Sequence, residues 1–137
     1  MSFPVPASPV VFVIDNDLAV LSALAFALEA EGYRTCAFRS PARADRSPDL
    51  RIAACIVLDQ VLPEESGLDF IARLRRENGR PHAILIPSAP PLHVRLAALD
   101  MGIPIIEKPL LDDALFAAIR TLVCAQIAES KTSWNGT

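Results

Sequence analysis

Ala54-Cys55-Ile56-Val57-Leu58 is an apolar run that stops at an acid, Asp59. A continuous apolar run of this length is typical of a strand that is buried on both faces of a parallel sheet. Two further runs end in a comparable way. Residues 10–14 are followed by the acidic segment 15–17, and residues 103–106 are followed by Glu107 and Lys108. Two strands that end in acids and one that ends in a lysine make a phosphoryl and metal site plausible.

The order of the elements predicts an alternating β/α chain. The predicted strands cover residues 10–14, 34–38, 54–58, 83–86 and 103–106. Helical spacing of apolar residues predicts helices over 18–31, 68–76, 92–101 and 110–128, with Asp112 and Asp113 in the first turn of the last one. Segment 40–50 contains two prolines and predicts at most a short or distorted helix. Such alternation implies a five-stranded parallel sheet with helices on both faces, a doubly wound (βα)5 fold.

Size and composition favour one domain. We expect a loose N-terminal segment at 1–9, a domain at 10–128 and an unstructured tail at 129–137 of this 137-residue chain. The net charge of −3 provides no basic surface for nucleic acid. No apolar run reaches the roughly 18–20 residues that span a membrane, and the first residues do not resemble a signal peptide. The odd number of cysteines, all within apolar stretches, predicts reduced core residues of a cytoplasmic protein.

The polar residues that follow the strands converge on one edge. In a parallel sheet of this kind the site lies at the carboxyl ends of the strands. The residues expected at this edge are Asp15, Asn16, Asp17, Asp59, Ser88 and Lys108. Clustered carboxylates need a cation, and Mg²⁺ prefers oxygen ligands of this kind. A nearby lysine and Mg²⁺ could hold a phosphoryl group, which an aspartate can accept.

These segments resemble a known family. The motifs at 13–17 (Val-Ile-Asp-Asn-Asp), 58–63 (Leu-Asp-Gln-Val-Leu-Pro), 66–68 (Ser-Gly-Leu) and 107–109 (Glu-Lys-Pro) are similar to those of receiver domains of two-component response regulators, within the FixJ-like group. The resemblance covers roughly residues 10–123. It implies a flavodoxin-like sheet with the strand order 2-1-3-4-5.

The resemblance also implies a role for each residue of the site. Asp59 is the expected phosphoacceptor, and Lys108 is expected to bond the phosphoryl group from a cis Lys108-Pro109 peptide. The expected Mg²⁺ ligands are Asp15, Asn16, Asp59 and the backbone carbonyl of Val61.

Three positions depart from the family pattern. Asn16 stands where the family usually has a second acid, so we expect weaker Mg²⁺ binding. Either Pro87 or Ser88 occupies the position of the family's hydroxyl switch residue, and the motif context favours Ser88. Ile105 replaces the aromatic switch residue.

Three functions are compatible with these patterns. The first is a stand-alone receiver, a signalling domain and not an enzyme, that takes a phosphoryl group from a sensor histidine kinase or a phosphotransfer protein. It would then switch a protein-binding surface on its fourth and fifth helices, and a homodimer is an option. The second is a degenerate receiver that binds partners without phosphorylation.

The third function is a phosphatase. Residues 14–17 also resemble the Asp-x-Asp motif of haloacid-dehalogenase-like phosphatases, with Asp15 as nucleophile and Asp17 as acid–base. Against it, a helix starts directly after the motif and the chain is short for that family. Asp17 is also a good candidate for the N-cap of that helix.

Overall fold

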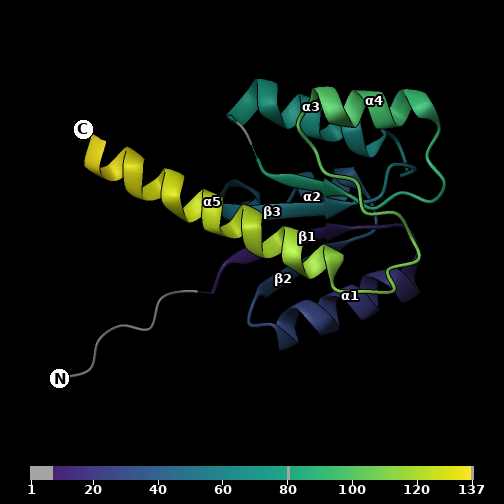
Figure 1. Ribbon diagram of the computed structural model, residues 1–137, viewed down its shortest axis with the longest axis horizontal. Coiled ribbons are helices and arrows are strands. Elements are labelled where there is room, and N and C mark those ends of the chain that lie inside the picture. Colours follow the sequence, from purple (N-terminus) through teal and green to yellow (C-terminus); the bar gives the residue numbers. More distant parts are fainter. Residues whose placement is uncertain (1–7, 80, 137) are drawn as a thin grey trace.

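The computed structural model describes residues 8–79 and 81–136. Four parallel strands form one sheet, which is flanked by helices (Figure 1). The strands are β1 (Val10–Ile14), β2 (Arg34–Phe38), β3 (Ala53–Leu58) and β4 (Ala83–Leu85), in the order β2-β1-β3-β4. The helices are α1 (Leu18–Ala30), α2 (Pro41–Asp45), α3 (Gly67–Asn78), α4 (Leu92–Asp100) and α5 (Ala114–Gly136), with the 3₁₀ turn η1 (Pro48–Ile52) between α2 and β3.

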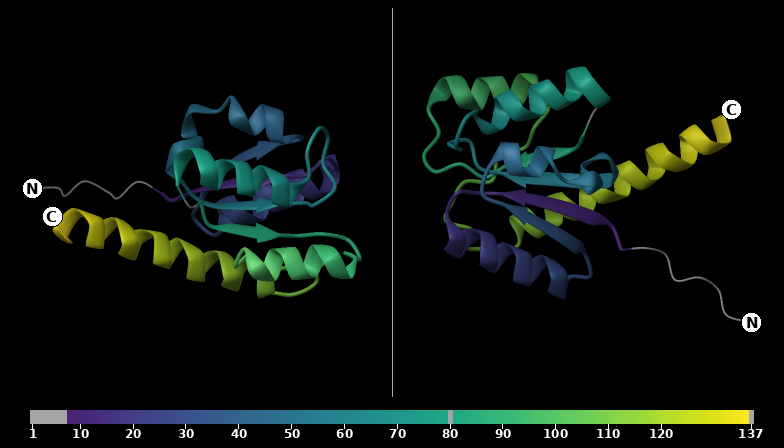
Figure 2. Two further views of the ribbon diagram at one scale, coloured as in Figure 1. Left: turned by 90° about the horizontal axis from the view of Figure 1, so that it is seen from above. Right: turned by 180° about the vertical axis from the view of Figure 1, so that it is seen from behind.

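Two core clusters lie on the two faces of the sheet. Along β1, Phe12 and Ile14 join the cluster that packs against α2, α3 and α4, whereas Val11 and Val13 join the cluster that packs against α1 and α5. This alternation is the two-residue period of a strand, and both faces are apolar because both are covered. Figure 2 shows α5 along one face, with its distal end extending beyond the sheet.

The prediction of a fifth strand is wrong. Residues 103–106 make one isolated parallel bridge, between Ile105 and Leu85. The amide of Leu85 donates to the carbonyl of Pro104 (2.9 Å), and the amide of Ile106 donates to the carbonyl of Leu85 (2.9 Å). The segment therefore runs beside β4 in the fifth place, but Pro104 has no amide hydrogen with which to extend a ladder.

The two prolines of segment 40–50 start helical turns. Pro41 opens α2 after the cap Ser40, and Pro48 opens η1 after the cap Ser47. Proline suits the first helical position because its missing amide hydrogen would have no partner there. The segment therefore contains two short helical pieces instead of one helix, in agreement with the expected short or distorted structure.

Helix α5 differs from the prediction at both ends. It begins at Ala114, so Asp112 and Asp113 precede its first turn, and the carboxylate of Asp112 accepts a hydrogen bond from the amide of Ala114 (2.9 Å). It continues to Gly136, whereas the sequence predicts an unstructured tail at 129–137. Of the predicted loose segment 1–9, residues 1–7 lie outside the described residues.

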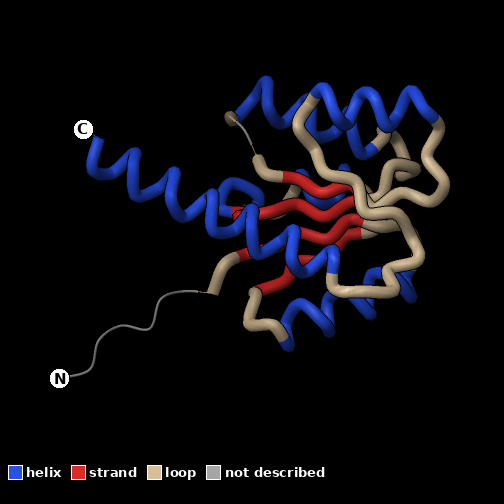
Figure 3. The backbone as a smooth tube through the Cα atoms, viewed as in Figure 1, coloured by secondary structure: helices blue, strands red, loops and turns tan. Residues whose placement is uncertain are grey.

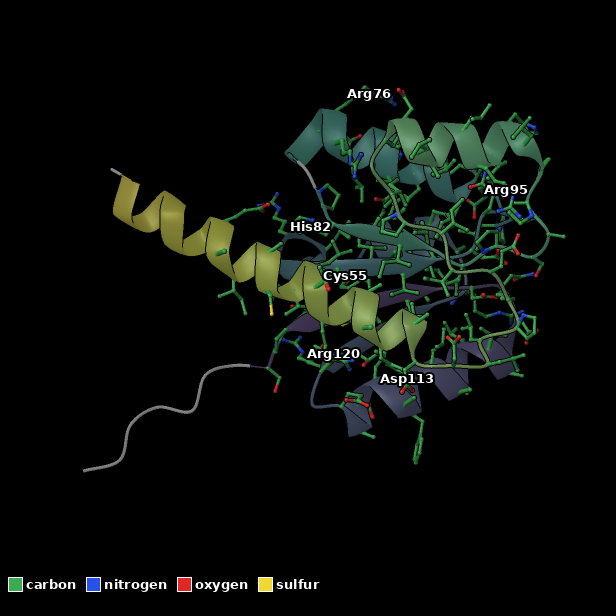
Figure 4. All side chains as sticks on the ribbon, viewed as in Figure 1. Cys55, Arg76, His82, Arg95, Asp113 and Arg120 are labelled. Carbon is green, nitrogen blue, oxygen red and sulfur yellow. The ribbon has the colours of Figure 1, made fainter. Side chains whose placement is uncertain are left out.

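The cysteines are free, and they differ in burial. Cys55 lies in the core on β3 (Figure 4), and burial raises the pKa of its thiol to about 12. The prediction of a reduced core residue is confirmed for Cys55. It is wrong for Cys124, which is exposed on α5, and Cys36 is partly buried. Within residues 8–79 and 81–136, none of the helices is long and apolar enough to cross a bilayer.

Candidate functional site

The candidate site lies where the strands end. Asp15 directly follows β1, and Asp59 directly follows β3. The two strands are neighbours, with Ile14 paired to Leu58, and the amide of Asp59 donates to the carbonyl of Ile14 (3.0 Å). Both carboxylates therefore leave the sheet side by side, at the edge where the loops gather on the right of Figure 3.

Lys108 reaches both carboxylates. Its amide donates to the carbonyl of Pro87 (2.9 Å), which ties the backbone after residues 103–106 to the loop after β4. Its Nζ lies 2.6 Å from Oδ2 of Asp15 and 3.1 Å from Oδ2 of Asp59. The Lys108-Pro109 peptide is cis, as the resemblance implied. Three distant parts of the chain thus bring two carboxylates and one ammonium together.

The electrostatics of this triad depend on mutual neutralisation. Asp15 is 1 % exposed, and its Oδ1 accepts a hydrogen bond from the amide of Asp17 (2.9 Å). The Nζ of Lys108 is the charged partner of its buried Oδ2, which accepts no hydrogen bond from any other described residue. Burial lowers the pKa of Lys108, but the close carboxylates of Asp15 and Asp59 outweigh it, and the net shift is upward.

All of the predicted site residues line one open cavity of about 380 Å³. Asn16 is exposed, the side chain of Val61 is exposed, and Ser88 is exposed on the cavity wall. Pro87 also lines the cavity but is buried, which leaves Ser88 as the hydroxyl at this wall. The full lining comprises Asp15, Asn16, Asp17, Asp59, Gln60, Val61, Pro87, Ser88, Pro90, Pro91 and Lys108.

The donor set of the cavity fits a hard divalent cation. Two carboxylates, from Asp15 and Asp59, stand beside the amide of Asn16 and the backbone of Val61. Mg²⁺ is bound through one or two carboxylates with several waters retained, so it does not need a cage of acids. The described residues contain no group of three His, Cys, Asp or Glu side chains that could hold a metal, so any cation here would depend on two carboxylates, neutral oxygens and water. The buried Oδ2 of Asp15 has the ammonium of Lys108 beside it and accepts no hydrogen bond from another described residue, so it keeps a lone pair for a cation or its water.

Asp17 does not belong to this donor set. Its carboxylate accepts hydrogen bonds from the amides of Ala19 (2.9 Å) and Val20 (3.4 Å) and so caps α1. The N-cap interpretation is confirmed. An N-cap of this kind typically contributes about 1 kcal/mol to the stability of the helix.

Two residues that support the site were not singled out from the sequence. Gln60 accepts hydrogen bonds at its backbone carbonyl from Gly67 (3.0 Å) and at Oε1 from the amide of Leu68 (3.0 Å). Gly67 lies so close to the site strand that a Cβ atom there would be 2.2 Å from the carbonyl oxygen of Asp59. Gly67 belongs to the Ser66-Gly67-Leu68 motif of the resemblance, but the sequence did not show its close approach to Asp59, and nothing in the pattern marked Gln60.

Lys108→Ala will lower stability without abolishing the fold. The variant leaves the buried Asp15 carboxylate without its counter-charge, and breaking such a pair costs about 3 kcal/mol. Urea unfolding at pH 7 measures the loss, and Lys108→Ala combined with Asp15→Asn should recover most of it. If the double variant is no more stable than Lys108→Ala, the pairing of these two residues is not the cause.

The fold and this edge together define a doubly wound, flavodoxin-like α/β domain with an acidic site closed by a lysine. The family model of the response regulator receiver domain matches residues 11–120, and the chain belongs to this family of two-component signalling domains. The predicted resemblance to receiver domains is thereby confirmed.

Individual relatives agree with this assignment. The chain is 32 % identical over 116 residues to the transcriptional regulatory protein FixJ of Azorhizobium caulinodans, covering 84 % of this chain and 55 % of that protein. It is 29 % identical over 114 residues to the transcriptional regulatory protein BasR of Escherichia coli, covering 82 % of this chain and 51 % of that protein. The chain therefore spans about half the length of these curated relatives.

Solved structures show the same fold. The signal receiver domain of an HD domain-containing protein from Pseudomonas fluorescens superimposes with a TM-score of 0.83 at 23 % identity, over 95 % of this chain and 97 % of that one. A CheY-like receiver domain from Methanospirillum hungatei gives a TM-score of 0.78 at 20 % identity, over 90 % of this chain and 99 % of that one.

Proposed function

We propose that this domain accepts a phosphoryl group on Asp59 from a phosphohistidine of a sensor kinase or phosphotransfer protein. An oxygen of Asp59 forms the new bond to phosphorus, the bond from phosphorus to the donor's imidazole nitrogen breaks, and the imidazole leaves. The observation that carries the proposal is the shared contact of one ammonium with the carboxylates of Asp15 and Asp59 inside one open cavity.

Each neighbour has a task in this proposal. Asp15, Asn16, Asp59 and the carbonyl of Val61 would hold Mg²⁺, which would neutralise charge on the transferred group. Lys108 would exchange a carboxylate contact for a phosphoryl oxygen, because its Nζ already lies between both carboxylates. The hydroxyl of Ser88 lies on the same wall and would donate to the phosphoryl group.

The surface that responds would be α4. Arg95 on α4 forms an ion pair with Glu107, the residue before Lys108, and Figure 4 shows Arg95 at the site end of the molecule. A displacement of Lys108 therefore acts on α4 through its neighbour. The outward side of α4 carries exposed apolar residues, Leu92, Leu96 and Leu99. Partner proteins, or a second copy, would bind this side.

A phosphorylation-independent receiver is the second candidate. The neutral side chain of Asn16, the buried Pro87 and the non-aromatic Ile105 favour it, since each departs from the family pattern. Beryllofluoride with Mg²⁺ separates the two candidates when amide shifts are followed by NMR. Binding with shifts at Ser88 and along α4 supports the phosphoacceptor. If saturating beryllofluoride and Mg²⁺ cause no amide shifts at these residues, the domain is a degenerate receiver.

A phosphatase that uses Asp15 is not favoured. Its nucleophile would be a carboxylate that is 1 % exposed and paired with Lys108. Its acid–base would be Asp17, which is engaged as the cap of α1. If Asp17 took part in proton transfer, its carboxylate could no longer cap α1.

Asn16→Asp will raise the affinity for Mg²⁺. The added carboxylate faces the cavity at an exposed position, and roughly 1.4 kcal/mol of additional charge attraction corresponds to about a tenfold gain. Calorimetric titration measures it. Gln126→Glu adds the same charge beside Pro81 and His82, at the opposite end of β4, and should leave the affinity unchanged. Equal affinities of wild type and Asn16→Asp would mean that residue 16 does not contact the ion.

A further inference from the structure

The loop between β3 and α3, residues 59–66, carries the Val61 carbonyl of the proposed metal site. Its two ends are tied together, because Gln60 accepts hydrogen bonds from the amides of Gly67 and Leu68. Its middle contains a left-handed residue, Glu64 (φ 75°), and the side chain of Val61 is exposed. The conformation of this middle part therefore depends on what anchors it to the body of the domain.

Arg73 on α3 supplies such an anchor. Its Nη2 donates to Oε1 of Glu65 (2.6 Å), and its Nε donates to Oε2 of the same carboxylate (3.4 Å). The two bonds form a fork that restrains the carboxylate in position and in orientation. The side chains of Arg73 and Glu65 are 27 % and 26 % exposed, so water screens the pair less than it screens an ordinary surface salt bridge.

The guanidinium is itself held from the other side. Nη2 donates to Oδ2 of Asp45 at the end of α2 (2.7 Å), and Nη1 donates to Oδ1 of the same residue (3.4 Å). Glu77 lies one turn further along α3, with Oε2 at 3.7 Å from Nη1. The guanidinium carbon lies 5.2 Å from the ring centroid of Phe70, a buried core residue. Hydrogen bonds from Glu65 and then Asp45 raise the pKa of Arg73, so the group stays charged.

We propose that Arg73 is a positioning residue of the phosphorylation site: through Glu65 it holds the β3–α3 loop, and with it the Val61 carbonyl, against α2 and α3. This inference rests on the proposed function of the site. Neither Arg73 nor Glu65 lines the cavity, so both act through the loop and not by contact with the ion.

Arg73→Met separates positioning from charge. Removal of a nearby cation should, by charge alone, strengthen the binding of a divalent cation. Loss of positioning should weaken Mg²⁺ binding. We expect a loss of about tenfold, as for other residues that hold metal ligands in place without touching the metal. Methionine keeps an unbranched apolar side chain beside Phe70. The sign of the change in Mg²⁺ affinity, measured by NMR titration with Mg²⁺ alone, therefore decides between the two effects.

Two further variants serve as controls. Asp45→Ala removes the α2 arm but keeps the Arg73–Glu65 fork on α3, so its Mg²⁺ affinity should lie closer to that of the wild type than the affinity of Arg73→Met does. Arg73→Lys keeps the charge but loses the fork, and it should fall between wild type and Arg73→Met. Unchanged or tighter Mg²⁺ binding by Arg73→Met would overturn the proposal.

Amide hydrogen exchange tests the same role without metal. Residues 61–65 should exchange faster in Arg73→Met than in wild type, whereas the amides of β1 and β3 should not change. Equal exchange of the loop in both proteins would overturn the positioning role. A wild type that fails to bind Mg²⁺ would instead count against the proposed function, and the exchange experiment would still decide whether Arg73 holds the loop.

Discussion

Asp59→Asn abolishes the incorporation of phosphate from acetyl phosphate in the presence of Mg²⁺. The amide of asparagine is not a nucleophile for phosphorus, whereas the carboxylate of Asp59 is. Asparagine has nearly the same shape, and it can still accept the hydrogen bond that the amide of Gln60 donates to Oδ1 (2.7 Å). The variant should therefore fold normally. Radiolabel from acetyl phosphate or the intact mass of the protein measures the effect.

Asp15→Asn is the matched variant for this experiment. It should lower the labelling or remove it, because Asp15 would hold the cation that the transfer needs. Loss of label in Asp59→Asn alone, or in both variants, agrees with the receiver mechanism. If the label survives in Asp59→Asn and is lost in Asp15→Asn, the nucleophile is Asp15, and the phosphatase is favoured.

Gly67→Ala will be strongly destabilising and will also impair phosphorylation. A Cβ atom at this position would lie 2.2 Å from the carbonyl oxygen of Asp59 and 3.1 Å from Cδ1 of Leu85. The first contact is to backbone, so α3 or the end of β3 has to move. Overpacking of this kind costs about 3 kcal/mol, and the shift displaces Asp59, the proposed phosphoacceptor. Urea unfolding and acetyl phosphate labelling measure the two effects.

Gly102→Ala is the control for Gly67→Ala. Gly102 has a φ of +68°, and its added Cβ would meet no described atom within 4 Å. The left-handed conformation alone should cost about 1 kcal/mol, and labelling should be unaffected. Equal losses at both positions would show that the close approach to Asp59 is unimportant.

The strands and most of the site were predictable because the information is local. Runs such as Val10–Ile14 are apolar throughout, and the parallel sheet buries both of their faces. Once the strands are known to be parallel, their carboxyl ends share one edge, and Asp15, Asp59 and Lys108 meet there by topology. The prediction of the fifth strand was wrong because the apolar pattern does not show that Pro104 lacks the amide hydrogen that a strand ladder needs.

The supports of the site were not predictable. Arg73 lies in a polar position of an amphipathic helix, where most arginines are solvated. Its role appears only when α2, α3 and the loop at Glu65 come together. The same holds for Gln60, whose side chain caps a helix that starts seven positions later in the chain.

The amino-acid sequence alone determined that this chain forms alternating strands and helices with its acids and its lysine at one edge. Hydrophobic periodicity and strand-terminal polar residues act over a few neighbours, and they are legible without coordinates. Only the tertiary structure decided which oxygen meets which nitrogen and which distant arginine restrains the loop. Such contacts join residues far apart in the chain, and they form only when the elements have packed.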